Sequence, residues 1–514
     1  MFHIFLAQSF SGWAIFALKL FAVLLLIAIA LVILTVLVMF IIDITQTKNS
    51  IRRNYPVLGR FRKLFSHLGE FFRQYFFAQD REEMPFNRAE REWIDRVSKQ
   101  GSETVPFGST RNLTPGAVIF ANGMFPKMEG EHTLHVPKLI GAGAEHPYQP
   151  KSFFNISAMS YGSLSKPAVQ ALSYGAAMGE CWLNTGEGGV SPYHLEGGCD
   201  LIYQLGTAKF GACNEDGSLN VDKLRAVCEN PNIKMIELKL SQGAKPGKGG
   251  ILPAAKVTAE IAQIRGIPEG KAAISPNRHI EAANPEELLD LITHVREVSG
   301  RPTGIKMVLG DLSKLDEFIA AIAKRGADSA PNFITLDGGD GGTGAAPMPL
   351  LDNMGLTIRE SLPATVDALT KAGLRERIRI IATGKLITPA EVAWAFCAGA
   401  DFVSSARGFM FALGCIQAMK CNTNTCPTGV TTHNKRLQRG LNPENKAERV
   451  RKFVKTMRYE VGMIAHSCGV DHPNQLTRDH ALIVNASGRS KPLTAIWPNV
   501  EPVDTKLGKE RTSE

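Results

Sequence analysis

The feature that most constrains the fold of this chain is an alternation of short apolar runs with helical stretches. The apolar runs, each typical of a buried strand, are "NIKMIELKL" (232–240), "KAAISP" (271–276), "TGIKMVL" (303–309), "PNFITLDG" (331–338), "IRIIATG" (378–384) and "ADFVSSA" (400–406). Helical patterns lie between them, at 285–298, 315–326 and 388–399. Because strands that alternate with helices pair in parallel, we expect an α/β domain.

Two parallel architectures fit this alternation. Several of the runs end in Gly, Asp, Lys or Ser, which favours a closed (β/α)8 TIM barrel with its site at the C-terminal rim. A doubly wound open sheet is the alternative. No G-x-G-x-x-G motif opens a strand–helix unit, which weakens the dinucleotide-binding form of that alternative.

Residues 21–42, "FAVLLLIAIALVILTVLVMFII", carry no charge. Twenty-two residues at about 1.5 Å each cross the roughly 30 Å hydrocarbon core of a bilayer. A cleaved signal peptide and a buried soluble helix are the alternatives; the first usually has a shorter apolar region and a small-residue cleavage site. Basic residues follow the run and are scarce before it, so the positive-inside rule predicts a single-pass protein of the inner (cytoplasmic) membrane with its body in the cytoplasm.

The basic and aromatic stretch "FRKLFSHLGEFFRQYFF" (61–77) has two interpretations. It could lie on a membrane surface, or it could be an ordinary amphipathic helix that packs on the main domain. The formal charge of +9 is modest for 514 residues and gathers partly near the N-terminus, so we expect no nucleic-acid partner. Nine cysteines without regular spacing argue against a secreted disulfide framework.

Glycine-rich segments follow several predicted strands. They are "LNTGEGG" (183–189), "SQGAKPGKGG" (241–250), "LDGGDGGTGAAP" (336–347) and "ATGKLITPAEV" (382–392). Glycine at a strand end lets the backbone approach a ligand and point N–H groups at an anion. The runs at 337–344 and 383–385 and the "ARG" at 406–408 are expected after strands seven and eight, where barrels commonly bind phosphate. Lys306 lies inside a strand; we interpret it as reaching a flavin ring edge, and a snorkelling surface lysine is the alternative.

Three cysteines, Cys415, Cys421 and Cys426, lie within "GCIQAMKCNTNTCPTG" (414–429). Three thiolates suit a three-iron cluster, with one ligand per iron. A zinc site with His433 as fourth ligand is an alternative, and so are three inert buried cysteines. The proline after Cys426 favours the cluster, because ferredoxin-type runs end in Cys-Pro.

These motifs, taken together, resemble the FMN-binding synthase domain of glutamate synthases. The matching stretches are "AMSYGSLS" (158–165), "NTGEGG" (184–189), "QGAKPGKGG" (242–250), "KVTAEIAQIR" (256–265), "ISP" (274–276), "DGGDGGTGAAP" (337–347) and "GCIQAMKCNTNTCPTGV" (414–430). They run in one order from about residue 154 to 483, about two-thirds of the chain. The resemblance implies a (β/α)8 barrel that holds FMN beside a 3Fe-4S cluster.

The resemblance also assigns residues to roles. It implies catalytic or substrate-binding roles for Glu187, Gln242, Lys245 and Arg265. It implies contacts with FMN for Ser160, Lys306, Gly341, Gly342, Thr343, Gly384, Arg407 and Gly408, and iron ligation by Cys415, Cys421 and Cys426. A lysine and an arginine suit a dicarboxylate such as 2-oxoglutarate. Glu187 would orient or protonate an imine.

The implied activity is reductive amination of 2-oxoglutarate with ammonia to L-glutamate. The chain departs from the family pattern at Ile251, where a glutamine is usual, and no cysteine precedes Cys181 to serve a glutaminase domain. We therefore expect free ammonia or a separate glutaminase subunit, and an electron-donor protein, either ferredoxin or a membrane redox partner. An enzyme similar to N-methylglutamate synthase and a non-catalytic electron-relay subunit are the alternatives.

These observations predict five parts of the chain. They are a short N-terminal segment (1–12), a transmembrane helix (13–42), a basic and aromatic juxtamembrane linker (43–105), the barrel (106–490) with its iron–sulfur loop (414–430), and a C-terminal tail (491–514).

Overall fold

The computed structural model describes residues 2–101, 104–128 and 137–502, and side chains from residue 12 onward. The chain divides into two compact units, Met1–Ala89 and Glu90–Glu514. Part of the expected C-terminal tail, from residue 503, lies outside the described residues.

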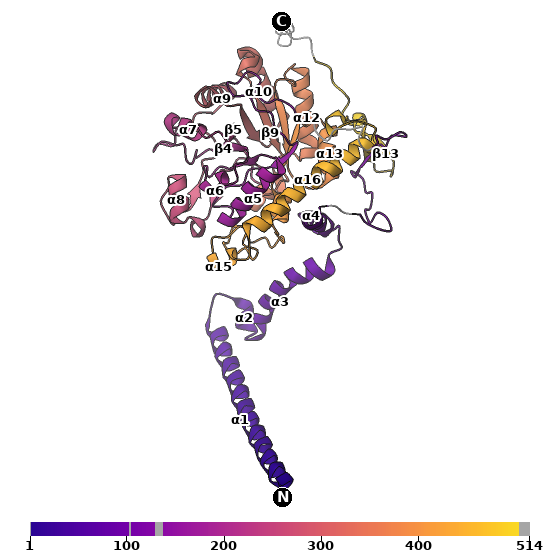
Figure 1. Ribbon diagram of the computed structural model, residues 1–514. Coiled ribbons are helices and arrows are strands. Elements are labelled where there is room, and N and C mark those ends of the chain that lie inside the picture. Colours follow the sequence, from indigo (N-terminus) through magenta and orange to yellow (C-terminus); the bar gives the residue numbers. More distant parts are fainter. Residues whose placement is uncertain (1, 102–103, 129–136, 503–514) are drawn as a thin grey trace. The chain divides into compact units, whose positions relative to one another are not determined.

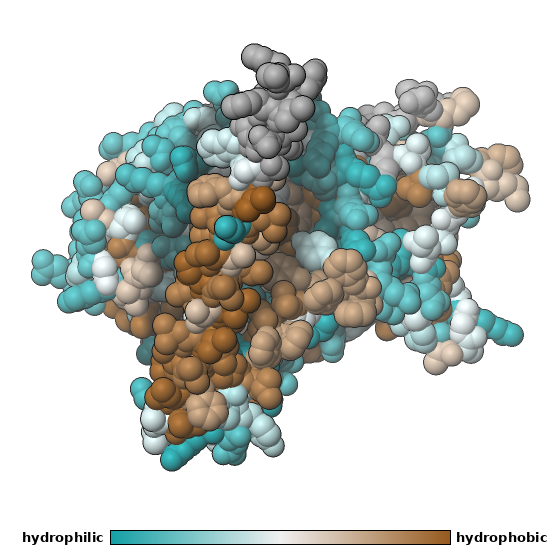
Figure 2. All heavy atoms as spheres, turned by 90° about the horizontal axis from the view of Figure 1, so that it is seen from below, coloured by the Kyte–Doolittle hydropathy of each residue, from teal (hydrophilic) through white to brown (hydrophobic). Residues whose placement is uncertain are grey.

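The first unit is helical. It consists of α1 (Phe2–Thr45), α2 (Ser50–Asn54), α3 (Leu58–Phe72) and a short π-helix, η1 (Arg73–Phe77). Among the described residues, α1 is the one helix that is long and apolar enough to cross a membrane, over Gly12–Thr45, and none of its 18-residue apolar stretch is buried. A signal sequence would have the same properties. The exposed apolar side chains of α1 contribute to the brown surface in Figure 2.

The second unit contains a closed barrel of eight parallel strands (Figure 1). The strands are β2 (Phe154–Ile156), β3 (Leu183–Asn184), β4 (Leu201–Leu205), β5 (Ile233–Lys239), β8 (Thr303–Met307), β9 (Phe333–Asp337), β10 (Arg379–Thr383) and β11 (Phe402–Ser405). Pairing of β11 with β2 closes the barrel, with Val403 opposite Phe154 and Ser405 opposite Ile156. The predicted (β/α)8 fold, with an apolar helix at the N-terminus, is confirmed.

Helices connect successive strands on the outside of the barrel. They are α5 (Lys166–Gly179), α6 (Pro192–Leu195), α7 (Val221–Cys228), α8 (Ala259–Arg265), α9 (Pro285–Ser299), α10 (Leu312–Arg325), α11 (Met348–Asn353), α12 (Ile358–Lys371) and α13 (Pro389–Cys397). After β11 follow α14 (Arg407–Ala412), α15 (Lys435–Gln438) and α16 (Pro443–Ser467). The predicted helix start at Thr388 is confirmed, because Thr388 and Glu391 form a capping box ahead of α13.

One predicted strand is not part of the barrel. Within "KAAISP" only β7 (Ala273–Ile274) forms, and it pairs antiparallel with β6 (Ile251–Leu252) in a small separate two-stranded sheet. Ile274 is exposed, which a strand inside a parallel barrel would not allow. The assignment of 271–276 to the parallel sheet was therefore wrong.

Apolar side chains fill the end of the barrel at which the strands begin. This cluster joins Ile140, Tyr148, Trp182, Ile202, Met235, Phe333, Ile381 and Phe402. A bridge between Ile140 and Tyr148 holds the segment that precedes the barrel against this end. A three-stranded sheet of β1 (Val118–Phe120), β12 (Ala481–Val484) and β13 (Ser490–Pro492) lies outside the barrel. The opposite end, where the strands finish, is left for polar side chains.

The long helix α16 packs beside α5 across the junction of the last and first strands. Gly175 makes the close approach possible, since a Cβ there would lie 2.5 Å from Cβ of Val450. Phe453 of α16 is completely buried and meets Phe154 of β2 and Phe409 of α14, with ring centroids 5.6 and 5.2 Å away. Trp93 of α4 (Arg88–Gln100) contacts the same ring.

Phe453→Ala should therefore lower the free energy of unfolding by about 3–5 kcal/mol, because it leaves a cavity between α16 and the barrel wall. The measurement is urea unfolding of the full chain in detergent, followed by tryptophan fluorescence. Tyr459→Ala, at an exposed site on the same helix, should change the free energy by less than about 0.5 kcal/mol. Equal effects of both substitutions would contradict this packing.

Candidate functional site

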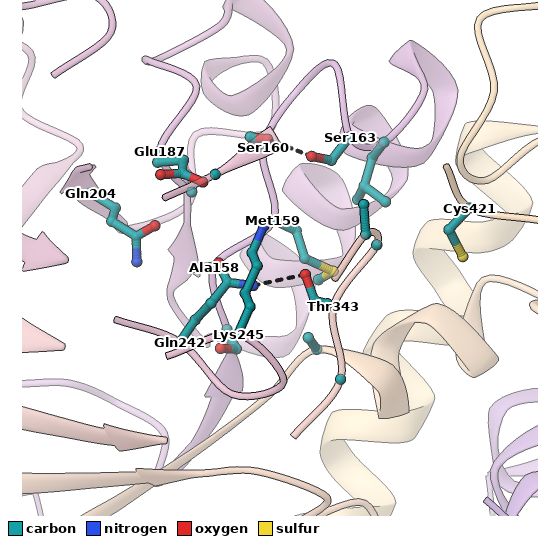
Figure 3. A pocket seen from close by; sticks show the side chains of 18 of the residues that line it. Ala158, Met159, Ser160, Ser163, Glu187, Gln204, Gln242, Lys245, Thr343 and Cys421 are labelled. Atoms are coloured by element: carbon teal, nitrogen blue, oxygen red, sulfur yellow. Dashed lines mark hydrogen bonds between the residues drawn. The ribbon is translucent and has the colours of Figure 1, made fainter. Parts of the chain in front are cut away.

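A large pocket opens at the end of the barrel where the strands finish. It encloses about 1330 Å³, including the open space at its mouth, which is ample for a ligand and its partner. Its walls come from segments that follow β2, β3, β5, β9, β10 and β11. Figure 3 shows Glu187, Gln204, Gln242, Lys245 and Thr343 around it, with Cys421 to one side.

The centre of the pocket is a carboxylate among cations. The Nζ of Lys239, the last residue of β5, lies 2.9 Å from Oε1 of Glu187. Burial raises the pKa of Glu187, but attraction to Lys239, Lys245 and Arg265 outweighs it, so the pKa is lowered overall. Glu187 is therefore an ionised carboxylate that accepts hydrogen bonds.

The other two cations, Lys245 and Arg265, are buried with less opposite charge near them. Burial lowers the pKa of Lys245 to about 8, repulsion by Lys239 adds to the fall, and Glu187 opposes it. Burial likewise lowers the pKa of Arg265 to about 10, against the attraction of Glu187. The Nε atom of Arg265 is buried without a hydrogen-bond partner among the described residues. Three cations around one carboxylate leave an excess of positive charge, which favours an anionic ligand.

The turn after β5 is held in place by hydrogen bonds across the pocket. The Nε2 of Gln242 donates to Oγ1 of Thr343 at 2.8 Å (Figure 3), and Lys239 donates to Oε1 of Gln242. Gly243 lies so close to the loop after β9 that a Cβ would be 2.4 Å from the carbonyl oxygen of Gly338. The turn after β5 and the glycine-rich loop after β9 therefore form one connected wall of the pocket.

Lys306 of β8 points into the pocket and is buried. Its Nζ lies 3.3 Å from Oδ2 of Asp337, the last residue of β9. Burial lowers the pKa of Lys306, but attraction to Asp337 and Glu237 outweighs it, so the pKa is raised and the amine is a permanent cation. The alternative of a snorkelling surface lysine was wrong, because the amine stays inside the barrel.

Beneath the pocket, Glu237 of β5 is fully paired. Its carboxylate accepts hydrogen bonds from Nδ2 of Asn184 at 2.8 Å, Nε2 of Gln204 at 2.6 Å and Oγ1 of Thr335 at 2.5 Å. Every member of the group is buried. This buried hydrogen-bond network is a rigid polar layer beneath the cations of the pocket.

Three loops form one side of the pocket, and two of them contribute glycines. Gly342 follows β9, Gly384 follows β10, and the start of α14 follows β11. A Cβ at Gly342 would lie 2.7 Å from Nε of Arg407. Gly384 has φ +117°, and a Cβ there would lie 2.7 Å from the amide nitrogen of Gly338. The loop at 337–344 follows the sixth strand of the barrel and not the seventh as expected, whereas 384 and 406–408 follow the seventh and eighth.

Ser160 and Arg407 also lie at this wall. The hydroxyl of Ser160 is 2.9 Å from that of Ser163 (Figure 3) and accepts from Arg265 at 3.4 Å. Arg407 donates to the carbonyl oxygen of Thr343 at 2.5 Å and lies 4.0 Å from the sulfur of Cys421. Arg407 thus connects the glycine-rich loop to the cysteine segment.

Most of the predicted site residues line this one pocket. They are Ser160, Glu187, Gln242, Lys245, Arg265, Lys306, Gly342, Thr343, Gly384, Arg407 and Cys421. Four predicted residues do not line it: Gly341, Gly408, Cys415 and Cys426. Gly341 packs between Gly338 and Asp337, and Gly408 packs beneath Phe453.

The cysteine segment runs beside the pocket between α14 and α16. Burial raises the pKa of Cys415, and the neighbouring thiols of Cys421 and Cys426 raise it further. Burial raises the pKa of Cys426, but hydrogen bonding with the hydroxyl of Thr428, 3.4 Å from the sulfur, and with the backbone of Thr431 outweighs it, so the pKa is lowered. Within the described ranges, no three His, Cys, Asp or Glu side chains converge as a ready metal site. The iron cluster and the zinc alternative thus both stay predictions.

His433, the expected fourth ligand of the zinc alternative, is engaged elsewhere. Its Nε2 lies 2.8 Å from the carbonyl oxygen of Gly162, and its ring contacts Tyr161 edge to face. Lys256 contacts the backbone of the cysteine segment, because its Nζ donates to the carbonyl oxygens of Ser163 at 2.6 Å and Cys421 at 3.3 Å. Burial lowers the pKa of Lys256 to about 8, and attraction to Cys421 and Cys426 opposes this.

Sequence reasoning missed several residues of the pocket. Lys239, Lys256, Gln204 and Asp337 all line it. Lys239 and Asp337 had a usable signal, since each is a charged residue that ends a buried apolar run. Gln204 and Lys256 had none, because β4 was not recognised as a strand and Lys256 lies in a short 3₁₀ turn.

Comparison with known proteins decides the family. A family model described as a conserved region in glutamate synthase matches residues 132–471. This chain belongs to the glutamate synthase family of oxidoreductases. It is 40% identical over 488 residues to the glutamate synthase large subunit-like protein YerD of Bacillus subtilis (strain 168), covering 87% of this chain and 92% of that protein.

Other family members match a smaller part of the chain. The archaeal glutamate synthase (NADPH) of Methanocaldococcus jannaschii is 35% identical over 318 residues, 62% of this chain and 59% of that protein. The chain thus spans about three-fifths of the length of this relative.

Among solved structures, a flavocytochrome b2 variant with benzoylformate is 14% identical over 81% of this chain and 86% of its own, with a TM-score of 0.44.

The charge cluster makes a testable prediction about Lys245. Its acetylation by acetic anhydride, followed by peptide mass spectrometry, should rise with pH around a midpoint near 8, because burial lowers the pKa. Glu187→Gln should move the midpoint to lower pH, since the lost carboxylate no longer stabilises the ammonium form. Glu269→Gln, at an exposed site outside the pocket, should leave the midpoint in place. An unchanged or higher midpoint in Glu187→Gln would contradict the described cluster.

Proposed function

We propose that this protein reductively aminates 2-oxoglutarate to L-glutamate, with FMN and a 3Fe-4S cluster as its cofactors. The observation that carries the proposal is the excess positive charge around Glu187 in a pocket at the rim of a glutamate synthase-family barrel. The relatives named glutamate synthase support the substrate and product.

The substrate is a dicarboxylate, and the pocket offers matching groups. Lys245 would bind one carboxylate, and Arg265, with its unpartnered Nε, would bind the other. Glu187 is ionised, so it would accept a hydrogen bond from the nitrogen of the imine and orient it. Lys245, with a pKa of about 8, would be the group able to exchange a proton near neutral pH.

The residues present fit FMN. Gly342, Gly384 and the start of α14 line one side of the pocket so closely that a Cβ added at either glycine would collide with Arg407 or Gly338, and Lys306 is a buried permanent cation in the same pocket. We propose that the loops after β9, β10 and β11 hold the phosphate and that Lys306 lies at the ring edge. FMN, when bound, supplies the two electrons that convert the imine to the amine.

For the cluster, the fit rests on the chemistry of the donors. Three thiols lie on one segment, burial and the thiols of Cys421 and Cys426 raise the pKa of Cys415, and the segment adjoins the cations Arg407 and Lys256. We propose Cys415, Cys421 and Cys426 as its ligands. An electron-donor protein would reduce the cluster. Ammonia would come from solution or from a separate glutaminase subunit. We further propose that α1 anchors the protein in the inner membrane with its body in the cytoplasm.

The deciding experiment uses the full chain in detergent under anaerobic conditions, reduced chemically. Addition of 2-oxoglutarate and ammonium should reoxidise the flavin, and Lys245→Met should slow this about 100-fold through loss of a charged contact. Lys248→Met, an exposed lysine in the same turn, is the matched control and should keep the wild-type rate. Reoxidation by other amines or acids alone would indicate an enzyme similar to N-methylglutamate synthase. No substrate-dependent reoxidation would indicate an electron-relay subunit.

Iron analysis tests the cluster separately. Anaerobically purified protein should contain iron and acid-labile sulfide, and Cys421→Ser should remove most of both, because a three-iron cluster has no spare protein ligand. Cys213→Ser, which alters a cysteine outside the segment and the pocket, should retain them. Iron-free wild-type protein, or iron that survives Cys421→Ser unchanged, would refute this ligand set.

A further inference from the structure

The helix α3, in the first unit, presents one continuous apolar face to its surroundings. Its apolar side chains recur every three or four residues: Leu58, Phe61, Leu64, Phe65, Leu68, Phe71 and Phe72. In the part of the chain that the structure describes, no residue of α3 is buried, and the side chain of Phe65 is 66% exposed. The face continues through η1 with Tyr75, Phe76 and Phe77, which are also exposed.

A buried ion pair fixes the start of this helix at the end of α1. Asp43, two residues before α1 ends, is completely buried. Its carboxylate accepts from Nε and Nη2 of Arg60 at 2.7 and 2.8 Å, and from the amide of Val57 at 3.0 Å. Arg52 of α2 adds a contact at 3.5 Å. The paired, two-pronged geometry holds the first turn of α3 beside the polar end of the apolar helix.

The charge around this junction has one sign. Between residues 44 and 69 the chain has no Asp or Glu, and its charged residues are Lys48, Arg52, Arg53, Arg60, Arg62 and Lys63. Lys63 lies on the side of α3 opposite the apolar face, and Arg62 lies at the edge of that face. An apolar face flanked by lysine, arginine and aromatic side chains is the pattern of helices that lie in a bilayer interface.

We propose that α3 and η1 lie on the surface of an anionic phospholipid bilayer, with the apolar face in the acyl boundary. The inference rests on the membrane span proposed for α1, because the Asp43–Arg60 pair ties α3 to its end. The basic residues meet the lipid phosphates, and Phe65 and Phe72 reach below them. Two helical elements, α1 across the bilayer and α3 with η1 along its surface, would hold the enzyme at the membrane.

The test places p-benzoylphenylalanine at single positions of the full chain, reconstituted in vesicles of a roughly 3:1 mixture of phosphatidylcholine and phosphatidylglycerol. After irradiation, mass spectrometry measures lipid adducts. Probes at Phe65 and Phe72 should give about tenfold more adduct than probes at Lys63 and Ser66, on the opposite side of the same helix. A probe at Val32, within α1, reports the span independently.

Equal labelling on both sides of α3, or crosslinks from Phe65 and Phe72 to the barrel in place of lipid, would overturn the proposal. If Val32 gives lipid adducts and the α3 probes do not, the surface helix fails and the span stands. If the α3 probes give lipid adducts and Val32 does not, the proposed span fails and the surface helix stands.

Discussion

The hydrogen bonds between β11 and β2 are the constraint on which the site depends. They join the last strand of the barrel to the first, with Ser404 opposite Asn155. In an open sheet, the segments after these two strands would lie at opposite edges. Closure brings Ser160, which follows β2, and Arg407, which follows β11, to one rim with the residues that follow β3, β5, β9 and β10. The packing of α16 on α5 covers this junction from outside.

Electrostatics separates the two polar layers inside that rim. In the lower layer, Glu237 has a hydrogen-bond donor on each side and is fully paired. In the upper layer, three cations share one carboxylate, Glu187, and burial leaves their charge poorly compensated. An uncompensated buried charge is costly unless a ligand of opposite charge completes it. The lower layer therefore serves as structure, whereas the upper layer is built to receive an anion.

The parts of the fold that could be predicted are those with long local patterns. Five of the barrel strands, β5 and β8 to β11, lie in apolar runs of five or more residues, and α9, α10 and α13 between them begin with capping side chains. β2 and β3 have only three and two residues, too few to show any period. "KAAISP" has the composition of a buried strand, but β7 within it pairs with β6 in a small two-stranded sheet outside the barrel. The composition of a short run does not show which strand it will pair with, and that pairing is set by the rest of the fold.

The same division holds for the candidate site. The sequence by itself determined the inventory: an uncharged run of membrane length, glycines where a backbone must come close, three thiols within twelve residues of one segment, and charged residues at strand ends. Only the tertiary structure decided which of these meet. Glu187, Lys239 and Arg265 come from three different segments, and Lys239 shows its importance only when β5 places its amine 2.9 Å from Glu187. Attraction between charges falls with distance and grows with burial, and both are properties of the folded barrel rather than of the chain.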